Sequence, residues 1–345
     1  MNFRQHQKGG NLFSAIEHQQ SMAQHVVGIL EIKDLIDWES FFPILVTITG
    51  YDKKHWSKGG NLPFHPLLMF KILILQAYHG LSDDAVEYQI KDRLSFMNFL
   101  DLQMGDSVPD AKTIWDFKEL IEKNQQDGSR KLFDHFHSLL SQQGLIAKEG
   151  SIIDASFVDV PKQRNSREEN KKIKEGERPD GFEKDTPKGA QKDCDARWTK
   201  KNNETHYGYK NHAKVDAKSK LIDSYSTTPA NRHDSQVFEC LLDDQDKAIL
   251  ADSAYLSEEN DQVLIEHSLE NFVMLKAQRN KPLSPVDEQY NKKVSRIRVR
   301  VEHVFGRLKA MGADYCRKVG LKRAKQHISL TNLTYNMDRY AFLAQ

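Results

Sequence analysis

The hydrophobic pattern of the chain changes its period near Gly150, and this change restricts the folds that the sequence can adopt. Between residues 29 and 144 apolar residues recur at intervals of three and four, which indicates amphipathic helices. After Gly150, short β-branched runs such as "SIIDASFVDV" alternate with helical segments. The sequence therefore predicts an all-helical part at residues 1–145, followed at residues 146–345 by an α/β domain, a mixed sheet flanked by helices.

Within the second part we expect the order strand, hairpin, helix, strand, helix, strand, helix. The hairpin turns near residues 216–219, and "KAILADSAY" is a buried strand that ends in Asp252. A charged stretch at residues 161–205, with 13 basic and 10 acidic residues, interrupts this order. Loops of that length inside a domain are usually functional or disordered, so we interpret the stretch as an insertion.

Positive charge is concentrated near the C-terminal end, although the formal net charge of the chain is only +1. Residues 291–325 contain twelve Lys and Arg residues and two acids, whereas residues 241–270 contain nine acids and one Lys. Such a separation is typical of a protein that binds a polyanion. Two oppositely charged solvated surfaces would give the same pattern, so charge alone leaves both interpretations open.

Several classes of protein are disfavoured by composition. The three cysteines are far apart and form no C-x-x-C pair, which argues against a disulfide framework and a structural zinc site. The N-terminal "MNFRQHQKGG" is polar, and the most apolar run, "PLLMFKILILQAY", is too short to span a bilayer. We therefore expect a cytoplasmic protein without a membrane segment.

The segment "RIRVRVEHVFGRLK" places one acid, Glu302, among five Lys and Arg residues. A helical period accounts for about eighteen residues of the local apolar pattern and strand alternation for about seven, so we expect a helix. On that helix Arg298, Glu302 and Lys309 lie on one stripe beside the apolar face. An ion pair between Arg298 and Glu302, worth roughly 0.3–0.5 kcal/mol, would be a sufficient structural explanation.

Two aspartates offer Glu302 a different role. Asp154 and Asp252 each lie in or directly after a β-branched run, where an unpartnered carboxylate costs several kcal/mol. Neighbouring strands would bring both to one sheet edge, and a helical carboxylate would complete an oxygen site for Mg²⁺ or Mn²⁺. Two such ions promote in-line phosphoryl displacement. A helix cap by Asp252 and a backbone hydrogen bond by Asp154 remain the simpler roles.

These residues resemble the DDE transposases of bacterial insertion sequences, whose catalytic domain is ribonuclease-H-like. "IIDAS", "ILADSAY" and "RVEHVFGRLK" look like the three catalytic blocks of that family, in the usual order. The third block is commonly written Y-(2)-R-(3)-E-(6)-K; Arg298, Glu302 and Lys309 match it, and Ser295 stands at the tyrosine position. The resemblance covers roughly residues 60–340 and includes "DARWTKK", "HYGYKNHAKVD" and "ANRHDS".

The resemblance implies that Asp154, Asp252 and Glu302 form the catalytic metal-binding triad, with two Mg²⁺ or Mn²⁺ ions as cofactor. Asp159 is an alternative ligand, although five residues along a strand it would point to the other face. The implied reaction is hydrolytic nicking of double-stranded DNA at terminal inverted repeats, followed by attack of the freed 3′-hydroxyl on target DNA. We expect a homodimer or higher oligomer on DNA, whose N-terminal helices bind the ends of the element.

The expected DNA contacts come from the basic helix, the insertion and the hairpin. Trp198 would stack on an unpaired base or anchor its loop to the domain surface, and His233 would lie near the metal edge unless "ANRHDS" is only a helix cap. The expected DNA-binding residues are Arg298, Lys309, Arg300, Arg307, Trp198, Tyr209, Lys210 and His233.

Two other functions stay open at this point. The chain could be a ribonuclease-H-like nuclease that cuts without joining, because the joining step has no signature in the sequence. It could also be a catalytically silent DNA-binding descendant of a transposase. The presence of all three acids argues against the silent protein, since a chain that needs no metal has no reason to keep them.

Overall fold

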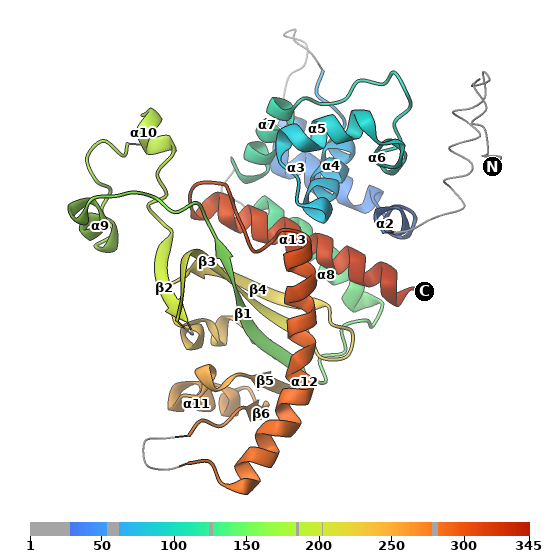
Figure 1. The fold of residues 1–345 in the computed structure, drawn as a ribbon. Coiled ribbons are helices and arrows are strands. Elements are labelled where there is room, and N and C mark those ends of the chain that lie inside the picture. The colour runs from blue at the N-terminus through green and yellow to red at the C-terminus, as the bar shows by residue number, and fades with distance from the viewer. Residues whose placement is uncertain (1–27, 54–61, 124–126, 184–185, 202, 278–281) are drawn as a thin grey trace, which may run out of the picture.

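The computed structural model describes residues 28–53, 62–123, 127–183, 186–201, 203–277 and 282–345. Figure 1 shows a mixed sheet with N-terminal helices on one side of it and one long helix crossing it. This is the α/β, ribonuclease-H-like fold with a preceding helical part that the sequence predicts. None of the described helices is long and apolar enough to cross a membrane.

The sheet has six strands in the order β2-β3-β1-β5-β6, and β4 also pairs with β3. β1 is antiparallel to β3 but parallel to β5, and β5 is parallel to β6. The expected hairpin is formed by β3 and β4. The strands are β1 (Ser151–Asp159), β2 (Arg197–Lys201), β3 (Glu204–Asp216), β4 (Ile222–Pro229), β5 (Ala248–Ala251) and β6 (Glu270–Val273).

The N-terminal helices begin where their sequences place capping residues. Pro66 opens α4 behind the cap His65, and the Ser82 hydroxyl accepts a hydrogen bond from the Ala85 N–H at the start of α5. The helices of this part are α2 (Ile29–Leu35), α3 (Phe42–Thr49), α4 (Pro66–His79), α5 (Asp83–Asp92), α6 (Leu94–Phe99), α7 (Ala111–Lys123) and α8 (Gly128–Gln142), with 3-10 turns η1 (Glu39–Phe41) and η2 (Tyr51–Lys53).

The basic segment is helical, as its period predicts. It belongs to α12 (Pro285–Ala310), which begins with a capping box between Ser284 and Asp287 and packs against β1 and β5. The other helices of the second part are α9 (Arg167–Lys174), α10 (Pro187–Ala190), α11 (Glu258–Glu266) and α13 (Leu321–Leu343). The segment expected as a helix after "ANRHDS" consists instead of two 3-10 turns, η4 (Asp234–Val237) and η5 (Glu239–Leu241).

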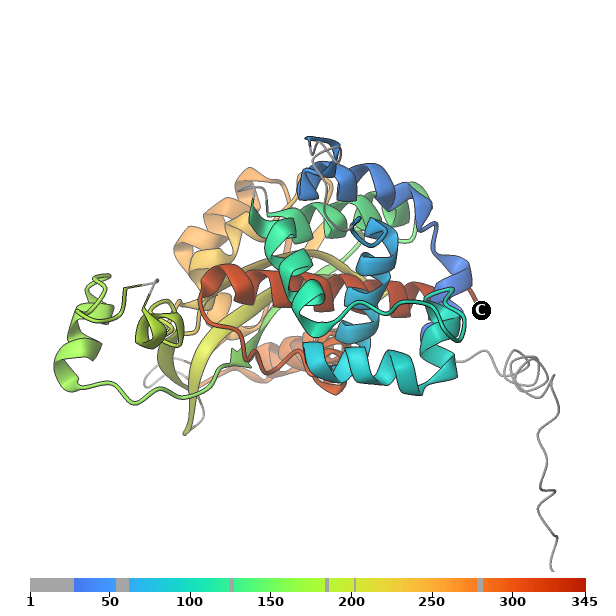
Figure 2. The same cartoon turned by 90° about the horizontal axis from the view of Figure 1, so that it is seen from above.

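The last helix, α13, joins the two parts of the chain. It packs against α4, α8 and β4, and Figures 1 and 2 show it running between the N-terminal helices and the sheet. The Asn332 side chain on α13 hydrogen-bonds Asn211 of β3, and Asn336 bonds both backbone groups of Ile222. One hydrophobic core therefore continues from α2 to the sheet. The domain boundary expected between residues 145 and 146 stays a prediction. α13 contacts helices that precede this position and strands that follow it.

The insertion at residues 161–205 contains α9, α10 and β2 and projects from the body of the molecule, as Figures 1 and 2 show. Its base is held by Asp193, which is 2% exposed. Both carboxylate oxygens of Asp193 accept a hydrogen bond from the Tyr209 hydroxyl, at 2.9 and 2.8 Å, and one also accepts the N–H of Gly320. The insertion is thus attached to β3 and to the start of α13.

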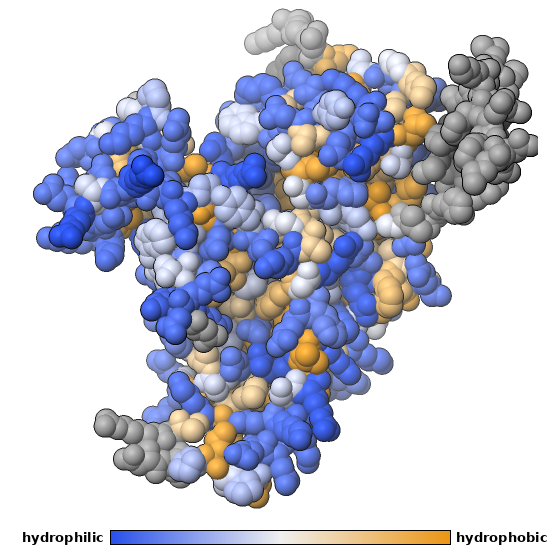
Figure 3. All heavy atoms as spheres, in the orientation of Figure 1, coloured by the Kyte–Doolittle hydropathy of each residue, from blue (hydrophilic) through white to orange (hydrophobic). Residues whose placement is uncertain are grey.

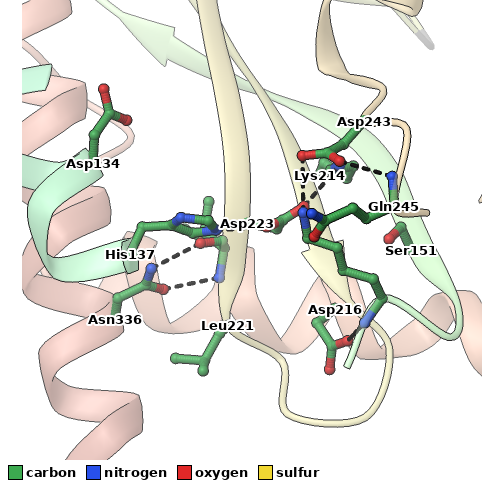
Figure 4. Close-up of polar contacts among 12 residues, drawn as sticks. Asp134, His137, Ser151, Lys214, Asp216, Leu221, Asp223, Asp243, Gln245 and Asn336 are labelled. Atoms are coloured by element: carbon green, nitrogen blue, oxygen red, sulfur yellow. Dashed lines mark hydrogen bonds and ion pairs between the residues drawn. The ribbon is translucent and has the colours of Figure 1, made fainter. Parts of the chain in front are cut away.

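A buried ionic network surrounds Lys214 on β3 (Figure 4). The Lys214 Nζ lies 2.7 Å from an oxygen of Asp223 and 2.6 Å from an oxygen of Asp246. Asp223 also bonds His137 of α8 at 2.6 Å, and Asp246 accepts from the Ser151 hydroxyl at 2.7 Å. Burial raises the pKa of Asp223, but His137 and Lys214 outweigh it and bring that pKa to about 2. The network connects α8, β1, β3 and the segment before β5.

Replacing Lys214 by Met should destabilise the protein strongly, because Asp223 and Asp246 would stay buried without their shared cation. Breaking a buried ion pair by removing one partner costs about 3–5 kcal/mol. Urea unfolding at neutral pH measures this loss, with Lys218→Met, an exposed site in the same hairpin, as the matched control. A loss similar to that of the control would show that the network contributes little to stability.

Acidification should destabilise the fold through His212, which has no exposed surface. Burial lowers its pKa to about 4, with Asp234 opposing this and Lys210 adding to it. An unfolded His takes up a proton near pH 6.5 while His212 stays neutral, so stability falls between pH 6.5 and 4 by about 1.4 kcal/mol per pH unit. His212→Gln should remove this part of the slope in unfolding experiments across that range. An unchanged slope would mean that His212 titrates normally in the folded protein.

Candidate active site at the sheet edge

Asp154 and Asp252 each follow the last residue pair between β1 and β5, which is Ile153 with Ala251. Asp252 comes directly after β5, whereas β1 continues to Asp159 and Asp154 lies within it, opposite Ala213 of β3. Since the two strands are parallel, both carboxylates emerge at the carboxyl end of β5, where open α/β sheets bind their ligands. The charge of Asp252 helps to raise the pKa of Asp154, so the two groups lie within electrostatic reach of each other.

The Asp154 carboxylate is largely buried and fully engaged. One oxygen accepts the N–H of Ala155 at 2.8 Å, and the other lies 2.7 Å from the Arg298 guanidinium of α12. Burial raises the pKa of Asp154, although Arg298 and the Ala155 N–H oppose this. Arg298 is held in turn by a contact to the Met274 sulfur at 3.5 Å. The backbone bond expected as the simple role of Asp154 is therefore present, together with an ion pair.

Asp252 caps the 3-10 turn η6 (Ser253–Tyr255), as its simple role requires, by accepting the N–H of Ser253. Beside it, the buried Tyr255 hydroxyl has no hydrogen-bond partner among the described residues. Burial raises the pKa of Tyr255 well above its ordinary value, and the charges of Asp154, Asp234 and Asp252 add to this. Tyr255 is thus a neighbour of the two aspartates that the pattern "ILADSAY" contains but that sequence reasoning did not select.

Glu302 lies one helical turn after Arg298 on α12, the helix that covers this edge. Its side chain is exposed and makes no hydrogen bond or ion pair with the described residues. Nor do the described residues contain a group of three or more His, Cys, Asp or Glu side chains placed to hold a metal ion. The structure thus places Asp154 and Asp252 within electrostatic reach of each other, and Glu302 does not complete a three-carboxylate group with them.

The donor atoms of Asp154 and Asp252 are suited to a hard divalent cation such as Mg²⁺, which prefers carboxylate oxygens. Asp154 already holds a cationic group at 2.7 Å, which is the position that a cation would take. The two aspartates therefore offer the type of donor atom that such a metal prefers, and the Arg298 guanidinium competes for one oxygen of Asp154. Asp159, the alternative ligand, is engaged elsewhere, since its carboxylate lies 3.3 Å from the His206 ring.

The other basic residues of α12 differ in whether their charged groups already have partners within the protein. Lys309 is 74% exposed and makes only a loose contact, 3.6 Å, with Asp314. Arg307 makes two bonds to the Asp338 carboxylate, at 2.9 and 3.0 Å, and Arg300 donates to the carbonyl of Ala217. Lys309 is therefore available to a ligand at once, whereas Arg307 and Arg300 would first have to leave partners within the protein.

The DNA contacts expected from the insertion and hairpin are also unequal. Trp198 is 46% exposed and lies over the Tyr207 ring, and His233 is exposed as the cap of η4. Tyr209 has no exposed surface and donates its hydroxyl to Asp193, while Lys210 is buried against Asp234 at 2.7 Å. Tyr209 and Lys210 thus stabilise the core rather than face solvent, because β3 is covered on both faces.

Two family models match the chain over most of its length. The first, described as "Transposase DDE domain", matches residues 146–337, and the second, described as "Transposase domain (DUF772)", matches residues 16–120. No solved structure matches the chain. The first match covers more than half of the sequence and contains Asp154, Asp252 and α12. This chain is therefore a member of the DDE transposase family, whose enzymes act on DNA and generally use divalent metal ions.

Proposed function

We propose that this transposase binds the terminal inverted repeats of an insertion sequence, nicks the DNA hydrolytically and joins the freed 3′-hydroxyl end to target DNA. The observation that supports this best is the pair of carboxylates, Asp154 and Asp252, at one sheet edge beneath a basic helix. Glu302 on that helix is the third member of the proposed catalytic set. We also propose that the enzyme is soluble and cytoplasmic and acts on DNA as a homodimer or higher oligomer.

Asp154, Asp252 and Glu302 would hold the divalent ions, Mg²⁺ or Mn²⁺. Bound there, the ions would activate water and stabilise the oxygens of the phosphate under attack. Arg298 has to release its Asp154 oxygen before that oxygen can bind a metal, and a DNA phosphate is a suitable new partner for its guanidinium. Glu302 lies one turn away on the same helix, so a small movement of α12 would shift both side chains together.

DNA would be held by the exposed basic and aromatic groups around this edge. Lys309 is free to contact a phosphate beside the scissile one. Trp198 rests on Tyr207 with part of its ring exposed, which leaves surface for stacking on an unpaired base. The N-terminal helices would bind the ends of the element, and the matched transposase domain there supports this assignment.

One observation favours a second candidate, the catalytically silent DNA-binding descendant. In this structure Glu302 forms no metal-holding group with the aspartates among the described residues, as would also be the case in a protein that had lost its metal site. Nuclease activity without joining differs from transposition only in the second chemical step. Assays of nicking and of joining on the same DNA distinguish both alternatives from a transposase.

Glu302→Gln should reduce Mg²⁺-dependent nicking of the terminal repeats by at least about a hundredfold, because it removes a charged metal ligand and keeps the side-chain size. Asp154→Asn and Asp252→Asn should do the same. A gel assay on a labelled repeat measures the rate, with Glu288→Gln, an exposed acid in the first turn of the same helix, as the control. Nicking by Glu302→Gln at the rate of the control would remove Glu302 from the triad.

Joining is tested by supplying the wild-type protein with a pre-cut repeat end and a supercoiled target plasmid. We expect plasmids that carry the labelled end covalently. Nicked repeats without any joined product would instead identify a nuclease, and the absence of both products would identify a silent DNA-binding protein.

Arg298→Gln should raise the affinity of the DNA-free protein for Mn²⁺ by about fivefold, since an ion pair worth about 1 kcal/mol no longer competes for Asp154. Paramagnetic resonance of free Mn²⁺ measures this without any catalytic turnover. Arg296→Gln, an exposed site on the same helix, controls for the loss of a positive charge. Equal affinity for the two variants would show that Arg298 does not compete with the metal.

A further inference from the structure

A second basic region surrounds the segment that connects α12 to α13. Arg317 and Lys318 in this segment line three hollows, with volumes of about 480, 360 and 250 Å³. The first hollow is bounded by α4 and α5, the second by Lys162 and Gln191 of the insertion, and the third by Trp115 of α7. We call these three hollows together the linker groove.

Figure 1 shows where the segment that connects α12 to α13 lies, and Figure 3 shows the character of the surface in the same view. The connecting segment lies between the insertion that carries α9 and α10 and the helices α5 and α7, and the surface of the insertion is mainly hydrophilic. Arg317 and Lys318 line both the hollow beside the insertion and the hollow beside α7. A chain-like ligand could therefore run from the N-terminal helices across the segment to the insertion.

The acids that line the groove already have partners within the protein. Asp83 pairs with Lys118, and Glu119 pairs with Arg323 at 2.7 Å. Asp193 accepts two bonds from Tyr209 and further backbone N–H groups. Among the described residues no carboxylate forms an ion pair with Arg317, Lys318 or Lys162. The groove thus carries an excess of positive charge.

Lys318 shows this imbalance most clearly. Burial, together with the charge of nearby Lys118, lowers its pKa to about 8, although the charges of Asp83 and Glu119 oppose this. The Lys318 Nζ finds only the Gln326 side-chain oxygen, at 3.4 Å. Next to it, the buried Nε2 atom of His327 has no partner among the described residues. An anion in the first hollow would add negative charge beside Lys318, with which no carboxylate of the described residues forms an ion pair.

The helix dipole of α13 is not the source of this attraction. The first backbone N–H groups of that helix are used by the protein itself, since Gly320 donates to Asp193 and Leu321 donates to Asp195. The positive field of the groove therefore comes from side chains, and it extends over three hollows rather than one helix end.

Aromatic residues lie at both ends of the groove. Trp115 is 39% exposed, with the Lys112 ammonium 4.1 Å and the Arg323 guanidinium 5.7 Å from its ring centre. At the other end, Lys162 lies 5.9 Å from the ring centre of Trp198. Basic side chains interleaved with exposed aromatic rings are typical of surfaces that follow a nucleic-acid backbone. A single small anion would need only one of the three hollows.

We propose that the linker groove binds the phosphate backbone of DNA outside the active site, with Arg317 and Lys318 as its central phosphate contacts. This rests on the proposed function only in taking DNA as the ligand. The path leads from α7 over the connecting segment to Lys162 and Trp198, which puts the bound strand on the same side of the insertion as the ring expected to stack on a base.

The test is DNA affinity as a function of salt, measured by fluorescence anisotropy on a labelled 40-base-pair duplex without divalent metal. The double variant Arg317→Gln, Lys318→Gln should bind at least about tenfold more weakly at 0.1 M salt. The slope of log affinity against log salt should become shallower by roughly 1.8, since each lost phosphate contact contributes about 0.9. The charge-keeping double variant Arg317→Lys, Lys318→Arg should restore both values.

The matched control is Lys247→Gln, Lys292→Gln, which removes two exposed positive charges away from the groove. Equal slopes for the control and the groove variant would overturn the proposal. The groove variant should fold normally, because Lys318 forms no ion pair that the substitution would break, and its thermal midpoint checks this. If the Arg317→Gln, Lys318→Gln protein unfolds instead, the charge-keeping variant carries the test, and a shallow slope in that folded protein overturns the proposal.

A second arm separates DNA from a small anion. Inorganic phosphate, compared with chloride at equal ionic strength, should protect the wild type against heating less than the duplex does. If the groove variant loses phosphate protection but keeps the full DNA slope, the hollow is a small-anion site and the DNA path is wrong. Nicking is measured separately. If the groove variant and the control have equal salt slopes while the wild type still nicks DNA with Mg²⁺, the groove proposal fails and the proposed function does not. If the wild type does not nick DNA but the salt slopes differ as expected, the proposed function fails and the groove proposal does not.

Discussion

The buried cation of Lys214 is the interaction on which the rest of this molecule depends. Its two carboxylate partners come from β4 and from the segment that leads into β5, and one of them also bonds Ser151 at the start of β1. Lys214 lies opposite Ile153, the residue before Asp154. The same contacts that neutralise one buried lysine therefore determine how β1, β3 and β5 align, and with them the edge at which Asp154 and Asp252 meet.

The second constraint is the attachment of α12 and α13 to that sheet. α12 brings a basic stripe across the edge, and its Arg298 reaches the Asp154 carboxylate. α13 then packs between the sheet and the N-terminal helices, with Asn332 and Asn336 satisfying polar groups of β3 and β4. Because the segment between the two helices has to turn at this point, Arg317 and Lys318 come to lie where the insertion and α7 face each other.

Much of the site was predictable from local patterns. Periodicity predicts the part of α12 that carries Arg298 and Glu302, and the β-branched run before Asp252 predicts the end of β5. The position of Asp252 directly after β5 follows from the same reasoning, whereas β1 continues beyond Asp154 to Asp159. The ionic contacts of Arg298 could not be predicted in this way, since helical spacing is equally consistent with a pair to Glu302 and with a bond to a residue 144 positions away.

The sequence by itself thus determined the helical first part, the order of most strands and helices after it and the carboxylates beside β5, because the period of a helix or strand is a local property. Only the tertiary structure decided which side chains remain available to a ligand. β3 reads as a half-exposed hairpin strand, yet α13 covers one of its faces and η4 the other, so Tyr209 and Lys210 are buried. Burial depends on segments more than a hundred residues away, such as the helix that carries Asn332, and no local pattern near Tyr209 records them.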